Sequence, residues 1–194
     1  MEARLFQGGR AIVMELYFML EEPSMKELLK MILPRVLPEG VQYYLIKHEG
    51  KQDLEKSLPR KLKTITQDVR FVVVRDQDSA DCHEVKQRLC AICSSSGRAD
   101  TVVRIACHEM ESWFLGDLQA VEKAYNIGRL SRRQQQRKYR NPDGLNNAAQ
   151  ELRRLVPTYQ KISGARTIGQ HMDINNNCSV SFRVFIEGVY KAIG

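Results

Sequence analysis

The sequence predicts an α/β fold in which a mostly parallel sheet is flanked by helices and followed by a helical C-terminal part. Two patterns indicate this fold. Short apolar or β-branched segments alternate with helical segments up to about residue 107, and every later segment has a helical pattern. We therefore expect a core over residues 1–125 and a helical extension over residues 126–194, packed together as a single domain.

Four segments have the composition of β-strands. Each is short, rich in β-branched or aromatic residues and bounded by polar residues. They are Ile12–Leu20, Val41–Ile46, Arg70–Arg75 and Thr101–Cys107. The first ten residues, MEARLFQGGR, are predicted to form a loose N-terminal extension.

Helical patterns lie between and after these strands. The first helix is predicted to begin at a capping box, Ser24 to Glu27, and Pro34 closes it. A long, mobile connection is expected from Arg129 to Gly144. The other helices are expected near Asp53–Lys63, Asp81–Ser94, Ser112–Tyr125, Asn146–Leu155, Ala165–Met172 and Ser181–Ala192.

The composition is that of a globular protein, with 43% apolar and 27% charged residues. The apolar run Ala11–Leu20 is too short to span a bilayer and contains Glu15, so no membrane segment is expected. The five cysteines are an odd number, which favours reduced thiols and a cytoplasmic location. Cys90 and Cys93 form a CxxC late in an apolar helical stripe, which favours buried thiols over a zinc or redox site.

The net charge of +7 and the pI of about 9.2 favour an anionic partner such as nucleic acid. The stretch Arg129–Arg140 holds six cations and no acid. It is either a phosphate-contacting patch or a solvated helix face or loop. Its candidate phosphate-binding residues are Arg132, Arg133, Arg137 and Lys138.

Acidic residues follow three of the predicted strands. Ligands of parallel sheets bind at the carboxyl ends of the strands, so these exits are the places to search for a site. Residues two apart on an extended backbone point the same way, so Asp76 and Asp78 can aim at one point if the extended form persists past Arg75. The acids at the three exits are Glu21, Glu22, Asp76, Asp78, Glu109 and Glu111.

A hard divalent cation explains such a group of acids. Mg²⁺ takes oxygen ligands and needs only one or two carboxylates, with waters or phosphate oxygens completing its shell. The alternative is structural: Asp78 or Asp81 caps the third helix, and Glu22 lies in solvent. An EF-hand loop is excluded because Asp81 and Gln87 stand where glycine and glutamate are required. A haloacid-dehalogenase-type phosphatase, which also uses Asp-x-Asp after a strand, remains a weaker alternative.

Six stretches, spread over nearly the whole chain, together resemble the bacterial family known as domain of unknown function 4276, which is Toprim-like. The stretches are LEEPSMKELL (Leu20–Leu29), HEGKQDLEKSLPRKL (His48–Leu62), VVVRDQDSADC (Val72–Cys82), VRIACHEMESWFLGD (Val103–Asp117), YQKISGAR (Tyr159–Arg166) and SFRVFIEGV (Ser181–Val189).

The resemblance implies roles for the acids. Toprim domains use a first glutamate as general acid or base, which would be Glu21, and an Asp-x-Asp pair to hold Mg²⁺, which would be Asp76 and Asp78. Glu109 and Glu111 resemble the later acidic motif of Toprim nucleases of the overcoming-lysogenization-defect type, and we favour Glu109 because it is nearer the strand end. The family also suggests protein partners in a mobile-element or phage-defence context.

The first strand exit departs from the family pattern Glu-Gly-Pro-Ser-Glu. Glu22 replaces the glycine, and Met25 replaces the second acid. Glycine would permit a tight turn and the close approach of a phosphate, whereas Glu22 adds bulk and negative charge. These differences weaken the expectation of catalysis but leave the expected fold unchanged.

Two further cations are candidates for contact with phosphate. Lys51 follows Gly50 at the exit of the second strand, although the surroundings do not form a P-loop and solvated lysine is the alternative. Arg166 has the planar fork that suits phosphate, and its alternative is an ion pair with an acid.

The sequence thus predicts a Toprim-like phosphoryl-transfer enzyme that depends on Mg²⁺ or Mn²⁺ and acts on nucleic acid as a nuclease. The alternative is a Toprim-like module that binds nucleic acid or a protein partner without catalysis.

Overall fold

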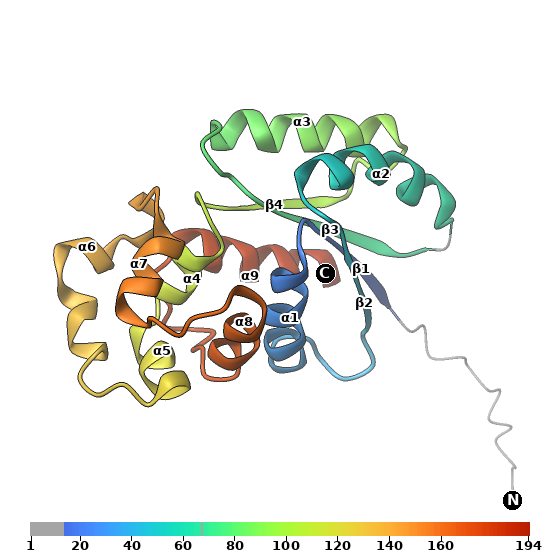
Figure 1. Cartoon of the computed structure of the whole chain (residues 1–194). Coiled ribbons are helices and arrows are strands. Elements are labelled where there is room, and N and C mark those ends of the chain that lie inside the picture. The colour runs from blue at the N-terminus through green and yellow to red at the C-terminus, as the bar shows by residue number, and fades with distance from the viewer. Residues whose placement is uncertain (1–13, 67) are drawn as a thin grey trace, which may run out of the picture.

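The computed structural model describes residues 14–66 and 68–194 (Figure 1). The predicted N-terminal extension and the first residues of the first predicted strand, 12 and 13, lie outside the described residues. The predicted parallel sheet forms the centre of the fold, and its four strands lie in the order β2-β1-β3-β4. Its strands are β1 (Glu15–Leu20), β2 (Gln42–Lys47), β3 (Arg70–Asp76) and β4 (Val102–Ala106).

Helices cover both faces of the sheet. Helices α2 and α3 lie on one face, and α1 and α9 lie on the other (Figure 1). Alternate strand residues explain this layering, since Phe18 and Val72 pack toward α1 and α9 whereas Met19 and Val73 pack toward α2 and α3. The helices are α1 (Pro23–Ile32), α2 (Lys51–Thr64), α3 (Cys82–Ser95) and α9 (Val180–Ile193).

A helical lobe lies beyond β4 and is joined to the sheet by one continuous apolar core. Helix α8 packs closely along α1, and Trp113 is fully buried against Phe182 and Phe185 of α9. The helices of this lobe are α4 (Glu111–Leu115), α5 (Leu118–Tyr125), α6 (Arg137–Arg140), α7 (Ala148–Leu155) and α8 (Lys161–Gly169). Short 3₁₀ turns are η1 (Leu33–Arg35), η2 (Ser131–Gln135) and η3 (Pro142–Gly144).

The single helix predicted over Ser112–Tyr125 is wrong. The structure divides it at Gly116, and Asp117 caps the start of α5 by accepting a hydrogen bond from the Ala120 N–H at 2.9 Å. A side chain at Gly116 would collide with Asn177, so the close approach of the chain near α9 requires glycine here.

Two local predictions also require correction. Ser24 lies inside α1 rather than at its cap, because Pro23 starts the helix and the Ser24 hydroxyl donates to Glu22. The segment from Arg129 to Gly144, predicted as a long, mobile connection, contains the short helical elements η2, α6 and η3. Gln134 fastens this segment by donating to the carbonyls of Leu115 and Tyr139.

Candidate active site

Three neighbouring strands deliver buried acids to one edge of the sheet. Glu21 follows β1, Asp76 ends β3, and Glu111 starts the helix after β4. Their exposed fractions are 8%, 5% and 0%, which is rare for carboxylates. Burial raises the pKa of Asp76 well above its ordinary value, and the charges of Glu22, Glu111 and Glu21 raise it further. We call Glu21, Glu22, Asp76 and Glu111 the acid cluster.

Glu21 lies at the topological switch point of the sheet, between the neighbouring strands β1 and β3, and main-chain hydrogen bonds hold it there. Its N–H donates to the Val74 carbonyl, and its own carbonyl accepts from the Gly50 N–H. Its Oε2 accepts a hydrogen bond of 2.8 Å from the Asp76 N–H and lies 3.8 Å from Nε of Arg75. Burial raises the pKa of Glu21 above its ordinary value despite these two partners.

Asp76 and Glu111 each hold an oxygen with no hydrogen-bond partner within the described part of the chain. These atoms are Oδ1 of Asp76 and Oε2 of Glu111, and both are fully buried. The other oxygen of Glu111 accepts a hydrogen bond of 2.9 Å from the hydroxyl of Tyr159. Burial raises the pKa of Glu111 as well. Unpaired buried oxygens are costly, so their presence at one sheet edge indicates a functional site.

Two cations offset the repulsion within the acid cluster. The Nζ atom of Lys161 lies 2.7 Å from Oε2 of Glu22. Burial alone would lower the pKa of Lys161, but the negative charges of Glu111, Glu22 and Asp76 raise that pKa above its ordinary value. Arg75 is only 2% exposed and forms an ion pair with Glu55. The carboxylates are therefore held together by a lysine from the helical lobe and an arginine from β3.

The structure separates Asp78 from Asp76. β3 ends at Asp76, and Asp78 has a left-handed backbone with φ of 58°, so the extended form does not continue and the two side chains do not align. The Asp78 carboxylate instead pairs with Lys51 at 2.8 Å on the protein surface. Its charge still raises the pKa of Glu21, so Asp78 lies at the margin of the acid cluster.

Glu109, favoured from the sequence over Glu111, lies outside the buried cluster. Its Oε2 accepts a hydrogen bond of 2.7 Å from the Ala149 N–H at the start of α7. Together with Asp78 and His108 it lines a pocket of about 460 Å³ beside the strand ends. Glu111 is therefore the member of the pair that the fold places with Asp76.

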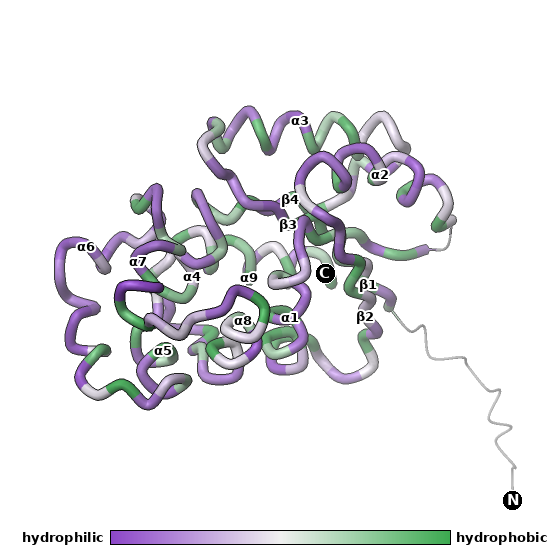
Figure 2. The backbone as a smooth tube through the Cα atoms, in the orientation of Figure 1, coloured by the Kyte–Doolittle hydropathy of each residue, from purple (hydrophilic) through white to green (hydrophobic). Residues whose placement is uncertain are grey.

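The predicted phosphate-binding residues are dispersed. Arg166 pairs with Glu27 of α1 at 2.6 Å, which is the ion-pair alternative, and Lys138 pairs with the buried Glu151. Arg132, Arg133 and Arg137 are exposed in η2 and α6. Figure 2 shows α6 mostly in the purple of hydrophilic residues.

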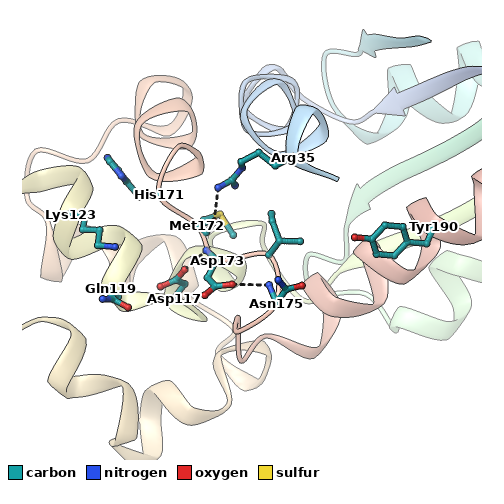
Figure 3. Close-up of a pocket in the computed structure, with 10 residues that line it drawn as sticks. Arg35, Asp117, Gln119, Lys123, His171, Met172, Asp173, Asn175 and Tyr190 are labelled. Atoms are coloured by element: carbon teal, nitrogen blue, oxygen red, sulfur yellow. Dashed lines mark hydrogen bonds between the residues drawn. The ribbon is translucent and has the colours of Figure 1, made fainter. Parts of the chain in front are cut away.

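A second polar pocket, of about 400 Å³, lies in the helical lobe (Figure 3). Two of its charged side chains, Arg35 and Asp117, already hold the chain together. Arg35 donates to the carbonyls of Met172 and Gly169, and Asp117 accepts from the N–H of Asp173. These side chains fasten the end of α8, so the acid cluster is the better candidate site.

Sequence reasoning gave no role to Arg75, Tyr159 or Lys161. Arg75 was visible next to Asp76, but nothing in the pattern showed that its side chain is buried. Tyr159 and Lys161 lie in the stretch YQKISGAR, which carries part of the family resemblance. That resemblance was the only available signal, because Lys161 meets Glu22 across 139 positions of sequence.

The fold and the strand-end acids define a class of α/β protein with a parallel sheet and an acidic site at its carboxyl edge. Two solved structures of the C-terminal region of the Xanthomonas campestris pv. campestris OLD protein, one phased with iodine and one with mercury, have the same fold. Each has a TM-score of 0.50 and 13% identity, and the match covers 94% of this chain and 97% or 98% of the other.

The chain belongs to the family described as Domain of unknown function (DUF4276), whose model matches residues 20–189. A search of curated proteins gives no significant match. Among residues 14–66 and 68–194, no helix is long and apolar enough to span a membrane.

Proposed function

We propose that this chain is a Toprim-like phosphoryl-transfer enzyme that uses Mg²⁺ or Mn²⁺ and cleaves nucleic acid. The observation that carries the proposal is the pair of buried, partnerless oxygens on Asp76 and Glu111, beside Glu21. Carboxylate oxygens are the donors that hard divalent cations prefer. The likeness to the OLD C-terminal region agrees with this choice of fold.

The donor set fits such a cation, although the described side chains form no complete metal shell. Within the part of the chain that the structure describes, no three His, Cys, Asp or Glu side chains are grouped to hold a metal. Mg²⁺ requires only one or two protein carboxylates, because waters and phosphate oxygens complete its shell. Asp76 and Glu111 would hold the ion, and a bound ion would polarise the phosphate.

The remaining residues of the site have roles that follow from their chemistry. Glu21 accepts the proton of the attacking water as the phosphorus–oxygen bond to that water forms. It then gives the proton to the leaving oxygen as the phosphorus–oxygen bond to the leaving group breaks. Lys161 places a positive charge beside the acids and can contact a phosphate oxygen. Tyr159 orients Glu111 through its hydrogen bond.

Calorimetric titration of Mn²⁺ into the purified full chain tests the metal site. We expect wild type to bind and Asp76→Asn and Glu111→Gln to lose binding, whereas Glu109→Gln should bind as wild type does. Repeating the titration with a phosphorothioate oligonucleotide detects an ion that enters only with phosphate. Equal binding by Asp76→Asn and wild type, or no binding by wild type in either titration, would contradict the proposal.

One observation favours a second candidate function, a non-catalytic module that binds nucleic acid. Lys161 already supplies a positive charge to the acid cluster through Glu22, one of the residues that departs from the family pattern. Such a module would bind nucleic acid with the same affinity in Mn²⁺ and in chelator. Cleavage of DNA or RNA that requires Mn²⁺ and is lost in Glu21→Gln would exclude it.

A further inference from the structure

A separate cationic pocket lies in the helical lobe, where the end of α5, η2 and the end of α7 meet. Its volume is about 380 Å³, and it shares no residue with the acid cluster. The pocket combines three arginines with apolar side chains. These residues are Arg129, Arg133, Arg154, Ile127, Leu130 and Leu155.

The charge of this pocket is not neutralised locally. No acid is among its lining residues in the described chain, and the side chains of Arg129 and Arg133 form no ion pair there. Arg154 pairs with Glu151, but that buried carboxylate also pairs with Lys138, so cations remain in excess. All three arginines of the pocket are exposed, and Arg129 and Arg133 have no ion pair among the described residues.

Glu122, an acid on the adjacent end of α5, does not cancel this charge. Its Oε2 accepts a hydrogen bond of 2.6 Å from the Ser131 N–H. This hydrogen bond from the Ser131 backbone is the main reason why the pKa of Glu122 lies below its ordinary value, so the carboxylate is engaged by the main chain of the turn. The arginine side chains therefore keep their capacity for an external anion.

The backbone of the turn is unusual at Arg129, where φ is 67°. Left-handed backbone is disfavoured for residues other than glycine, and Gly128 is the neighbouring residue. The chain nevertheless places an arginine in this conformation, where it lines the pocket. Such strain is found where a side chain must be held in a particular place.

We propose that Arg129, Arg133 and Arg154 form a phosphate-binding site, which shares no residue with the acid cluster and takes a backbone phosphate of a nucleic-acid strand. Guanidinium groups contact phosphate through paired hydrogen bonds. The partly exposed apolar side chains of Ile127 and Leu155 provide a surface for the attached sugar or base. The proposed function enters this inference only in the choice of nucleic acid as the source of the phosphate. A small free phosphate has the same chemistry and would bind the same arginines.

Binding of a fluorescent single-stranded oligonucleotide of about ten nucleotides, as DNA and as RNA, tests this site by anisotropy. Chelator is present throughout, so the result is independent of the metal site. We expect Arg133→Gln and Arg154→Gln each to weaken binding by about tenfold and to make it less dependent on salt. Arg153→Gln is the matched control, because Arg153 is exposed on α7 but does not line the pocket.

A calorimetric titration with inorganic pyrophosphate distinguishes the source of the phosphate. Oligonucleotide binding that depends on Arg133 and Arg154 supports a nucleic-acid strand. Pyrophosphate binding with the same dependence, but no oligonucleotide binding, supports the phosphate site with a small ligand. Equal weakening by Arg153→Gln would show a diffuse basic surface and overturn the proposal, as would the absence of binding to either probe. Neither result would alter the outcome of the Mn²⁺ titration.

Discussion

Replacing Asp76 by asparagine should make the metal-free protein more stable. Asp76 is almost completely buried, its Oδ1 has no partner among the described residues, and three other acids lie within electrostatic range. Asparagine has nearly the same shape and carries no charge. The substitution therefore removes the repulsion and the cost of burying a charge while it preserves the packing.

The size of the effect follows from the environment of the carboxylate. An unpaired buried polar atom costs about 1–3 kcal/mol, and each unit by which a fold raises an acid's pKa costs about 1.4 kcal/mol. We expect Asp76→Asn to increase the free energy of unfolding by about 2 kcal/mol near pH 8. Because the pKa of Asp76 is raised, the folded wild type binds a proton first as pH falls, so the difference should shrink toward about pH 5.

Urea unfolding in chelator measures this difference, with the fluorescence of the single, fully buried Trp113 as the signal. Asp78→Asn is the matched control. That carboxylate forms an exposed pair with Lys51, so its removal should change stability by less than about 1 kcal/mol. A variant less stable than wild type near pH 8, or an advantage that grows as pH falls, would refute the description of Asp76 as a strained, functional carboxylate.

Three other substitutions test the supports of the site. Tyr159→Phe removes the only side-chain hydrogen bond that the Glu111 carboxylate receives within residues 14–66 and 68–194, and it should lower the free energy of unfolding by about 2 kcal/mol. Gly116→Ala forces a methyl group against Asn177 and should cost about 2 kcal/mol or more, measured by the same unfolding assay. Burial lowers the pKa of His48, so its unfolded form protonates first as pH falls; stability should drop below about pH 6.5, and His48→Gln should reduce that drop.

Each of these substitutions has a control in the same chain. Tyr125→Phe removes a hydroxyl for which the described structure shows no hydrogen bond. Gly128→Ala adds a methyl group where no atom lies within 4 Å, and His171→Gln changes an exposed histidine. Control losses as large as those of the paired variants would show that the unfolding changes do not come from the contacts described.

The sheet could be predicted because each strand is recognised from the residues within its own short segment. Each strand is a short run of β-branched or aromatic residues, and parallel pairing follows from the alternation with helices. The acids at the strand exits were found for the same reason. The helix break at Gly116 was missed because its cause, the approach of Asn177, is 61 positions away in the sequence.

The choice between Glu109 and Glu111 shows the same limit within the site. Distance from the strand end favoured Glu109, but burial and the hydroxyl of Tyr159 place Glu111 with Asp76. The pairing of Asp78 with Lys51 was also hidden, since it depends on where the β3 backbone stops being extended. The direction of a side chain and its partners from distant parts of the sequence determine which acids lie in the site. The spacing of residues along the chain predicts neither.

The packing of α8 against α1 has a consequence for how the protein folds during its synthesis. Lys161 and Arg166 meet Glu22 and Glu27 across 139 positions, so the counter-charges emerge from the ribosome long after the acids that they neutralise. During that interval the acids of the nascent sheet can avoid burial only by remaining hydrated. The carboxyl edge of the sheet should therefore be the last part to close, and an interrupted chain would carry a sheet whose acidic edge stays open.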